Sequence, residues 1–294
     1  MGIEDLRGLI ARHATPGTCE PLSGVFLSRE TQPGPPQLST TGIGFALITQ
    51  GAKQLALGAQ TVEYGPGEYL VTSVDLPVVG RFTQASPDEP ALGFGMTLNP
   101  VEIAELLLTS GSARHTEEGI RQTLPSALLV GRAGAELIDA VTRLLRLLGR
   151  PTDLAVLSPM IKREILWLLL TGPQGQTIRQ LGLADSKLRP VSQAVQWIHA
   201  NSTAPLRVDE LAARVGLSTS AFHRTFRAVT GSSPLQFQKQ LRLHTARQLL
   251  TTGARSVTQI AVDVGYESTS QFNREYRRFF GRPPGRDRLG KQVL

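Results

Sequence analysis

The chain of 294 residues is poor in cysteine and in aromatic side chains, and it contains no long apolar run. Its one cysteine, Cys19, excludes an internal disulfide framework. No apolar stretch approaches the roughly 18 residues of a transmembrane helix, and the N-terminus does not have the basic and then apolar pattern of a secretory signal. We therefore expect a cytoplasmic protein without a membrane partner.

Residues with metal-binding or catalytic chemistry are scarce in the first 184 positions. The two histidines there, His13 and His115, fall outside the expected strands, whereas a metal site inside a β-barrel needs several histidines and a carboxylate that converge. Glu63, Glu68 and Asp75 lie on or near expected strands, where a carboxylate is more often solvated than catalytic. The sequence has no phosphate loop, nucleophile elbow or Cys-x-x-Cys pair. We expect no catalytic residue, no metal and no cofactor, and hence no enzyme.

Positive charge is concentrated at one end of the chain. Residues 185–294 carry 17 Lys plus Arg against 7 Asp plus Glu, net +10, which leaves 14 against 17, net −3, of the whole-chain totals of 31 and 24. A basic domain neutralises phosphates and releases counterions, so this distribution favours a nucleic-acid partner.

The basic region contains a helix-turn-helix pattern twice, with 49 positions between Val208 and its counterpart Val257. Each copy has a glycine at its turn, Gly216 and Gly265, where glycine supplies a left-handed conformation that other residues resist. The turns are followed by serines that can cap the second helices. Two apolar stripes at helical spacing are expected to be buried: Phe222, Phe226 and Val229 in the first copy, and Phe272, Tyr276 and Phe279 in the second.

The positions between these stripes face outward on each second helix. Arginine and amide side chains match the base edges of a DNA major groove, so a matched pair of such faces favours a reader of duplex DNA. The alternative is an ordinary solvated helix face. The outward residues are Ser220, His223, Arg224 and Arg227 in the first copy, and Ser270, Gln271, Arg274, Arg277 and Arg278 in the second.

The segments "LAARVGLSTSAFHRTFRAVTGSSPLQFQKQLRLHTARQLL" and "IAVDVGYESTSQFNREYRRFFGRPP" resemble the DNA-binding domain of the AraC/XylS family of transcription regulators. The resemblance implies an all-α domain in which one long helix, here residues 234–252, joins two helix-turn-helix units that enter successive major grooves. By the same resemblance, particular residues match base-reading positions of the family. These residues are Ser220, His223 and Arg224 in the first unit and Ser270, Gln271, Asn273 and Arg274 in the second.

The N-terminal half has a different pattern. Residues 3–13 form an amphipathic helix, and residues 24–97 read as short strands separated by Gly, Pro and Gln, which indicates an antiparallel barrel or sandwich. Helices are expected from Asn99, which with Glu102 forms a capping box before a helix with Pro100 at its first position. Residues 133–148 and 154–170 continue this helical part.

This half resembles the cupin-like sensor domain of one branch of the same family, through "KQLALG", "YGPGEYLVTSVDLPVVG" and "LSPMIKREILWLLLTG". The resemblance implies that the barrel detects an unidentified small-molecule effector and that the sensor half forms a homodimer. Tyr69 and Arg81 are candidates to line the cavity, although the sequence does not show which face of each strand lies inside. Cys19 is a second hypothesis, as a thiol that senses electrophiles, although the neighbouring Glu20 opposes the lowered pKa this needs.

We therefore expect an α+β protein of two domains: residues 1–172 as a cupin-like sensor and dimerisation domain, 173–190 as a linker, and 191–294 as a double helix-turn-helix domain. The apolar stripe of residues 137–148 either packs on the barrel or pairs with a second copy. The expected function is ligand-responsive, sequence-specific regulation at a promoter, with activation through contact with RNA polymerase favoured over repression. The alternatives are a ligand-independent regulator that uses the barrel only for dimerisation, and thiol sensing through Cys19.

Overall fold

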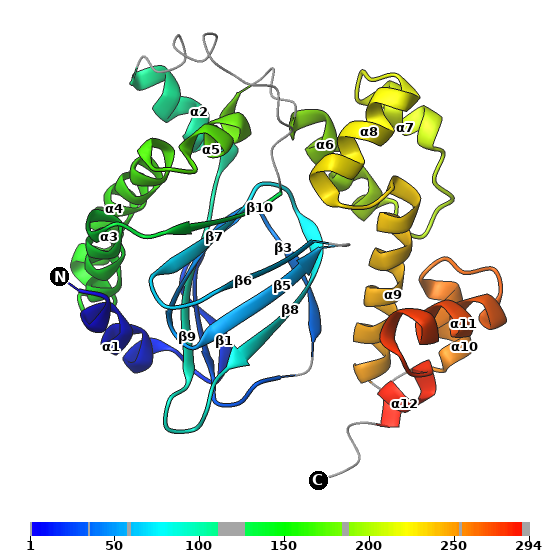
Figure 1. Ribbon diagram of the computed structural model, residues 1–294, viewed down its shortest axis with the longest axis horizontal. Coiled ribbons are helices and arrows are strands. Elements are labelled where there is room, and N and C mark those ends of the chain that lie inside the picture. The colour runs from blue at the N-terminus through cyan, green and yellow to red at the C-terminus, as the bar shows by residue number, and fades with distance from the viewer. Residues whose placement is uncertain are drawn as a thin grey trace. The chain divides into compact units, whose positions relative to one another are not determined.

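The computed structural model describes residues 2–34, 36–57, 60–110, 127–183, 188–252 and 255–289. The chain divides into two compact units (Figure 1). The first contains Met1–Ser192 with Ala228–Gly231, and the second contains Gln193–Arg227 with Ser232–Leu294. Across the described ranges, every helix is too short or too polar to traverse a lipid bilayer.

The first unit is built on two antiparallel sheets. One has six strands in the order β1-β2-β9-β4-β7-β10, and the other has four in the order β3-β8-β5-β6. The strands are β1 (Gly17–Leu22), β2 (Val25–Glu30), β3 (Gln37–Thr41), β4 (Gly44–Gln50), β5 (Ala52–Leu57), β6 (Gln60–Tyr64), β7 (Glu68–Thr72), β8 (Leu76–Gln84), β9 (Ala91–Thr97) and β10 (Leu128–Arg132). The predicted α+β class is confirmed, and the barrel-like part takes the form of two sheets.

Helices cover one face of the six-stranded sheet (Figure 1). They are α1 (Ile3–His13), α2 (Pro100–Thr109), α3 (Ala135–Arg146) with a 3-10 turn η2 (Leu147–Gly149), α4 (Pro151–Thr171) and α5 (Gly175–Gly182). Alternate strand residues such as Phe45 and Phe94 point to this face, where they join Leu6 and Ile10 of α1 in one apolar core. This alternation follows from the period of two in a pleated strand.

The stripe on α3 is buried within its own unit. Leu137, Val141, Leu144 and Leu145 belong to the same core as α1 and α4. Of the two predicted roles for residues 137–148, packing on the barrel side is therefore the one observed, and this stripe is not available to a second copy.

The structure corrects two details of the N-terminal half. Strand β10 lies between α2 and α3, where the sequence indicated only helices, because its short segment pairs with β7 far away in the chain. Residues 175–182, inside the predicted linker, form α5, and Ile178 of α5 is fully buried in the core of the first unit. The domain limits at residues 172 and 190 remain predictions.

The second unit is all-helical. It contains α6 (Leu188–Ala200), which begins in the first unit, and then α7 (Val208–Arg214), α8 (Thr219–Thr230), α9 (Pro234–Thr252), α10 (Val257–Asp263), α11 (Thr269–Phe280) and α12 (Pro284–Leu289). The predicted connecting helix at residues 234–252 is confirmed as α9. Phe226 of α8 meets Phe237 of α9 with ring centroids 5.5 Å apart, while a second core gathers around Phe272 and Tyr276 of α11.

Candidate nucleic-acid interface

The first helix-turn-helix consists of α7, a turn and α8. Gly216 has a φ of +73° in the turn, which confirms that a left-handed residue is needed there. The amide of Leu217 donates to the carbonyl of Ala212 at 3.0 Å and closes the end of α7. Ser218 caps α8 by accepting from the amide of Ala221 at 3.4 Å. These local contacts set the direction in which α8 leaves the turn.

The second copy repeats this geometry on α10 and α11. Gly265 has a φ of +86°, and the amide of Tyr266 donates to the carbonyl of Ala261 at 2.9 Å. Ser256 caps α10 by accepting from the Gln259 amide at 3.1 Å, and Ser268 caps α11 through the Gln271 amide at 3.3 Å. The caps predicted for the second helices are confirmed at Ser218 and Ser268, and the repeat is therefore structural as well as sequential.

The predicted buried stripes are confirmed except at one position. Phe222, Phe226, Phe272 and Tyr276 are fully buried. Phe279, which the spacing placed in the second stripe, is 37% exposed and lies edge-on against the ring of His244 on α9 at 5.3 Å. The stripe continues instead to Phe280, four residues after Tyr276, whose ring centroid lies 4.5 Å from that of Tyr276.

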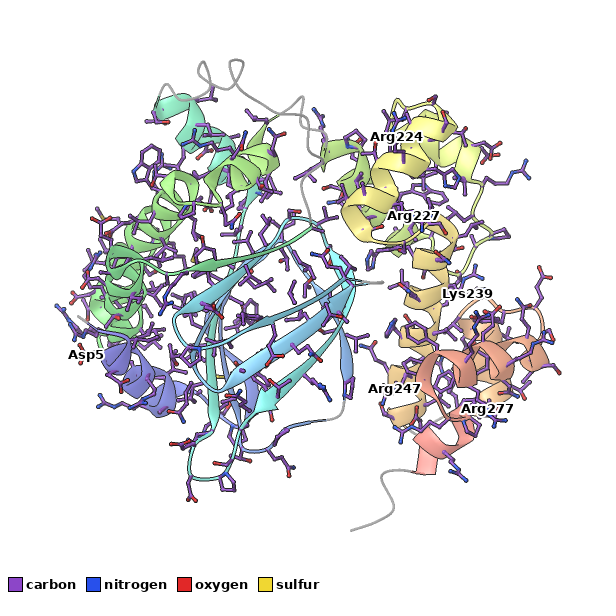
Figure 2. The ribbon with its side chains drawn as sticks, in the orientation of Figure 1. Asp5, Arg224, Arg227, Lys239, Arg247 and Arg277 are labelled. Carbon is purple, nitrogen blue, oxygen red and sulfur yellow. The ribbon has the colours of Figure 1, made fainter. Side chains whose placement is uncertain are left out.

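Every residue predicted to contact DNA is exposed on α8 or α11. Figure 2 labels Arg224 and Arg227 on α8 and Arg277 on α11. Within the described ranges, no carboxylate lies within 4.0 Å of the guanidinium groups on these two faces. The exposed set is Ser220, His223, Arg224, Arg227, Ser270, Gln271, Asn273, Arg274, Arg277 and Arg278.

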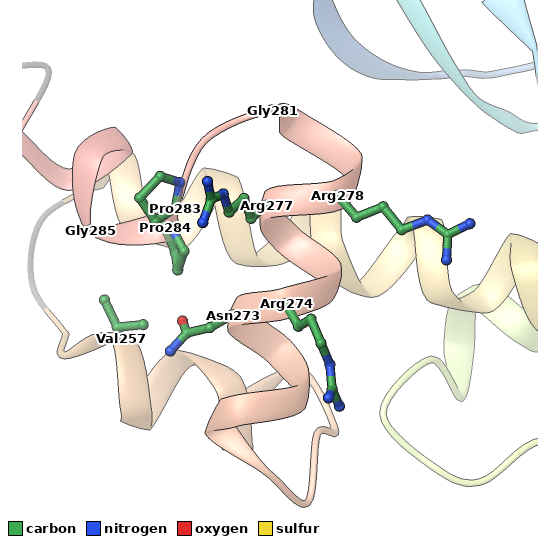
Figure 3. A pocket seen from close by; sticks show the side chains of 9 residues that line it. All are labelled: Val257, Asn273, Arg274, Arg277, Arg278, Gly281, Pro283, Pro284 and Gly285. Atoms are coloured by element: carbon green, nitrogen blue, oxygen red, sulfur yellow. The ribbon is translucent and has the colours of Figure 1, made fainter.

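A hollow of about 820 Å³ adjoins α11 (Figure 3). Its lining combines arginines of α11 with glycine and proline residues around the start of α12. Because these residues are small or rigid, the guanidinium groups of the arginines remain accessible to a ligand. A phosphate oxygen is an acceptor that matches arginine in charge and shape. The lining residues are Val257, Asn273, Arg274, Arg277, Arg278, Gly281, Pro283, Pro284 and Gly285.

Gln271 is less free than its sequence position suggests. Its side-chain amide donates to Glu275 Oε1 at 3.3 Å, one turn further along α11. The Glu275 carboxylate also accepts from Lys239 Nζ and from the Tyr266 hydroxyl, both at 2.9 Å. Hydrogen bonds and the charge of Lys239 outweigh partial burial and lower the pKa of Glu275. The Gln271–Glu275 spacing of four was the signal in the sequence that could have revealed this pair.

A buried polar cluster holds α12 against α9 and α11. The Tyr276 hydroxyl donates to Asp287 Oδ2 at 2.5 Å, and Arg282 and Arg247 pair with the same carboxylate at 2.5 and 3.5 Å. Burial and the bond to Asp287 raise the pKa of Tyr276. The cluster fixes the end of the recognition helix that carries Arg277.

The other candidate residues lie in the first unit. Tyr69 packs in the helix-covered core beside Phe45, and Arg81 donates to Gln54 on the exposed face of the four-stranded sheet, so neither side chain points between the two sheets. Cys19 is partly buried on β1, with its Sγ 3.9 Å from the carbonyl oxygen of His13. Thiol sensing through Cys19 stays a prediction.

The structure contains no cluster of three or more metal-ligating side chains among the residues it describes. His115, which entered the metal assessment of the sequence, lies outside those residues.

Comparison with known proteins agrees with the geometry of both units. Residues 21–177 match the family described as "AraC-type transcriptional regulator N-terminus", and residues 211–289 match "Helix-turn-helix domain". Among solved structures, fatty-acid-bound ToxT from Vibrio cholerae aligns over 90% of this chain and 94% of its own, with a TM-score of 0.55 and 13% identity. At that identity the likeness to ToxT shows the fold alone.

Two curated relatives illustrate the match in sequence. The thermoregulatory protein LcrF of Yersinia pestis is 30% identical over 176 residues, which is 60% of this chain and 65% of LcrF. The virulence regulon transcriptional activator VirF of Yersinia enterocolitica is 30% identical over 171 residues, 57% of this chain and 61% of VirF. The matched region is thus less than two thirds of either relative. Because the N-terminal family alone spans more than half of the chain and the helix-turn-helix match follows it, the chain belongs to the AraC-type transcriptional regulators.

Proposed function

We propose that this chain is a one-component regulator that binds duplex promoter DNA through its two helix-turn-helix motifs and activates transcription. The observation that carries the proposal is that both recognition helices present exposed, unneutralised arginines from one compact unit. Activation is favoured over repression because the relative VirF is named a transcriptional activator. Contact with RNA polymerase is the mode of activation we propose.

The exposed residues divide into two roles in this proposal. Those near the start of each recognition helix read base edges, because the first turns of such a helix lie deepest in the major groove. Cations further along bind phosphates, which supports affinity without carrying sequence information. The base-reading set is Ser220, His223, Arg224, Ser270, Gln271, Asn273 and Arg274, and the phosphate-binding set is Arg227, Arg277 and Arg278.

The proposal is tested by selecting duplexes from a random library with the full chain and measuring affinity at several salt concentrations. We expect one enriched sequence pattern, and an affinity that falls steeply with salt because each neutralised phosphate contributes about −0.9 to the log–log slope. Arg150 of the first unit, exposed and paired with Asp153, provides the control Arg150→Ala, which should bind like the wild type. Equal affinity for selected and scrambled duplexes at low salt would exclude a sequence-specific regulator.

We also propose that the first unit senses a small-molecule effector in the space between its two sheets. Lys53 on β5 pairs with Phe82 on β8, and its ammonium lies 5.0 Å from the centre of that ring. It shares a strand face with the buried Leu55, while Gln54 lies on the exposed face, so Lys53 points toward the six-stranded sheet. Burial lowers the pKa of Lys53, and the charge of Glu30 on β2 partly opposes this.

These surroundings favour an anionic effector with an apolar body. A partly desolvated ammonium gains from an opposite charge, and the neighbouring leucines and Phe82 can cover an aliphatic or aromatic chain. ToxT, which has a similar fold, has been crystallised with an unsaturated fatty acid, which is an apolar carboxylate. We therefore propose a carboxylic acid as the class of effector for this chain.

Self-association through the first unit is a further part of the proposal. With α3 committed to the core, the large exposed apolar side chains among the described residues of the first unit are Val101 and Leu108 of α2 and Val156, Leu157 and Met160 of α4. A homodimer would cover them, and Met160→Glu should then shift the full chain from dimer to monomer in sedimentation. A wild-type monomer at micromolar concentration would exclude this dimer. Acting on promoter DNA, the protein would work in the cytoplasm of a bacterial cell.

A further inference from the structure

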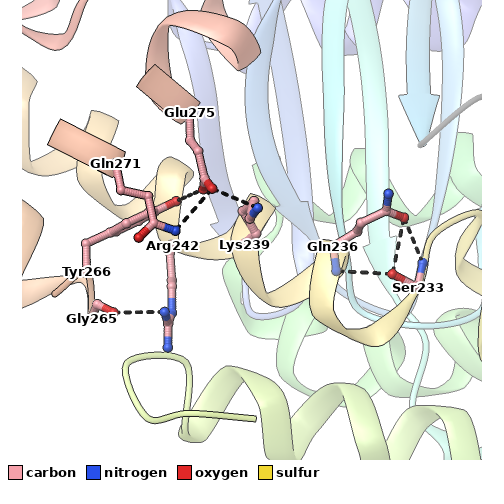
Figure 4. A network of polar contacts seen from close by, with 8 residues as sticks. All are labelled: Ser233, Gln236, Lys239, Arg242, Gly265, Tyr266, Gln271 and Glu275. Atoms are coloured by element: carbon pink, nitrogen blue, oxygen red, sulfur yellow. Dashed lines mark hydrogen bonds and ion pairs between the residues drawn. The ribbon is translucent and has the colours of Figure 1, made fainter. Parts of the chain in front are cut away.

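One side chain of the connecting helix binds backbone carbonyls of the segment that leads into the first helix-turn-helix motif and of the turn of the second. Arg242, in the middle of α9, donates from Nε to Ser202 at 2.6 Å and from Nη2 to Ala204 at 2.8 Å, in the segment that leads into α7. Its Nη1 donates to Gly265 at 2.8 Å, in the turn of the second motif. Figure 4 shows Arg242 reaching Gly265 from α9. A single guanidinium therefore spans the boundary between the two motifs.

Neighbouring contacts reinforce the same boundary. Gln238, one turn earlier on α9 and buried, donates from Nε2 to Ala204 at 2.8 Å. The turn of the second motif lies directly against the backbone of residue 203, which belongs to the segment that leads into α7. We call Arg242, Gln238 and the carbonyls of Ser202, Ala204 and Gly265 the Arg242 joint.

The joint is continuous with the second recognition helix. Lys239 of α9 and Tyr266 of the turn both donate to Glu275 on α11, which also accepts from Gln271 (Figure 4). The face of α9 that carries Arg242 thus holds the turn and α11 together. A movement of α11 relative to α9 would break the charge-assisted bond between Lys239 and Glu275, and a movement of the turn would break the one between Arg242 and Gly265.

Arginine suits this task better than other cations. Its planar fork carries donors in fixed directions, so three carbonyls bound at once define an orientation as well as a distance. The three carbonyls carry no negative charge that would balance the guanidinium, and burial lowers the pKa of Arg242. A residue that only stabilised the second motif would not need to bind acceptors in the segment that leads into α7.

We propose that the Arg242 joint fixes the separation and relative orientation of α8 and α11, and therefore the spacing between the two half-sites that the chain reads. The inference rests on the proposed DNA-binding function and makes Arg242 a positioning residue. In B-DNA one added base pair moves a half-site by about 3.4 Å and turns it by about 34°. A rigid pair of recognition helices cannot follow that displacement, whereas a loosened pair can.

The test measures binding of the full chain to the wild-type-selected duplex and to versions with one base pair added or removed between the half-sites. We expect the wild type to lose about tenfold or more in affinity for either altered spacing, comparable to one mismatched base pair. Arg242→Gln should show a loss of less than about threefold for the altered spacings, with unchanged preference within each half-site. Arg242→Lys, which keeps the charge without the fork, should fall between the two.

The control is Arg255→Ala, which removes an arginine bond of 2.7 Å to Asp263 inside the second motif only and should keep the wild-type spacing penalty. A wild type that selects no sequence would defeat the proposed function itself. A wild type with a strict spacing that both Arg242 variants retain would overturn the inference alone. Unfolding of both variants, judged by circular dichroism where the wild type is folded, would overturn it too, because Arg242 would then serve folding rather than positioning.

Discussion

A β-carbon on Gly265 would stand 2.3 Å from the carbonyl oxygen of Thr203, whereas one on Gly216 would meet no atom within 4 Å. Both glycines occupy the same place in their motifs and have similar positive φ angles, +86° and +73°. The two turns are thus matched in conformation and differ in packing. From the sequence repeat alone, the two turns would be expected to be equivalent.

The first prediction uses this difference. Gly216→Ala should lower the free energy of unfolding by about 1 to 2 kcal/mol, the cost of a left-handed non-glycine residue. Gly265→Ala should cost about 1 to 3 kcal/mol more, because the methyl group displaces the backbone at residue 203. Urea unfolding of both variants measures this difference. Equal destabilisation would mean that the second turn does not press against residue 203 in solution.

The second prediction concerns pH. Burial, with a smaller effect from the charge of Arg247, lowers the pKa of His244 from 6.5 to about 3, and the rings of Phe279 and Phe280 enclose it. A depressed folded-state pKa contributes stability that is present above pH 6.5 and is lost as pH falls toward 3, because the unfolded chain binds the proton first. Between pH 7 and pH 5 the second unit should lose about 2 kcal/mol from this group.

Hydrogen exchange of α9 and α11 in the full chain, followed by mass spectrometry, measures that loss within the second unit. His244→Leu is the control, since it fills the site with an apolar side chain and has no proton to bind. The wild type and the variant should therefore diverge as pH falls from 7 to 5. Parallel profiles would show that His244 is not held neutral.

The helices with strong local signals could be predicted from the sequence. α1 begins and ends at the predicted residues because it has a clear apolar stripe, and α9 has the range that the family resemblance implied, beginning at Pro234. The capping serines of both motifs depend on contacts within four residues, so they too were accessible. Exposure of the recognition faces followed from the spacing of Phe222, Phe226, Phe272 and Tyr276.

Features that depend on distant partners could not be predicted. Strand β10 is defined by its pairing with β7. Ile178 and Leu181 do indicate a short docking turn inside the linker, but the full helix α5 depends on packing against the core of the first unit. The bonds of Arg242 end on backbone carbonyls, which every residue has, so no pattern of side chains marks them. Long-range backbone contacts of this kind need the folded chain.

The third prediction concerns the effector. Oleate, an unsaturated fatty acid, should raise the melting temperature of the full chain by mass action, while oleyl alcohol, which has the same chain without the charge, should have a smaller effect. Lys53→Met should abolish the difference between the two compounds and leave the fold intact, because it replaces a partly buried ammonium with an apolar side chain of similar length. Arg81→Met, on the exposed face of the same sheet, is the matched control and should keep the difference. If oleate and oleyl alcohol shift the melting temperature of Lys53→Met as they do that of the wild type, Lys53 does not bind the carboxylate of the effector.

The last prediction separates the two proposed roles on the recognition helices. Arg224→Ala and Arg274→Ala should each cost about 1 to 3 kcal/mol on the selected duplex and relax the preference at one base pair, because a bidentate arginine discriminates among bases. Arg278→Ala, four residues beyond Arg274 and so about one turn further along α11, should weaken selected and scrambled duplexes by similar factors and reduce the salt slope by about one. Fluorescence anisotropy with single-base substitutions of the duplex measures all three. If Arg224→Ala and Arg274→Ala instead weaken every duplex equally, these arginines bind the backbone, and base reading must come from the amide and hydroxyl groups beside them.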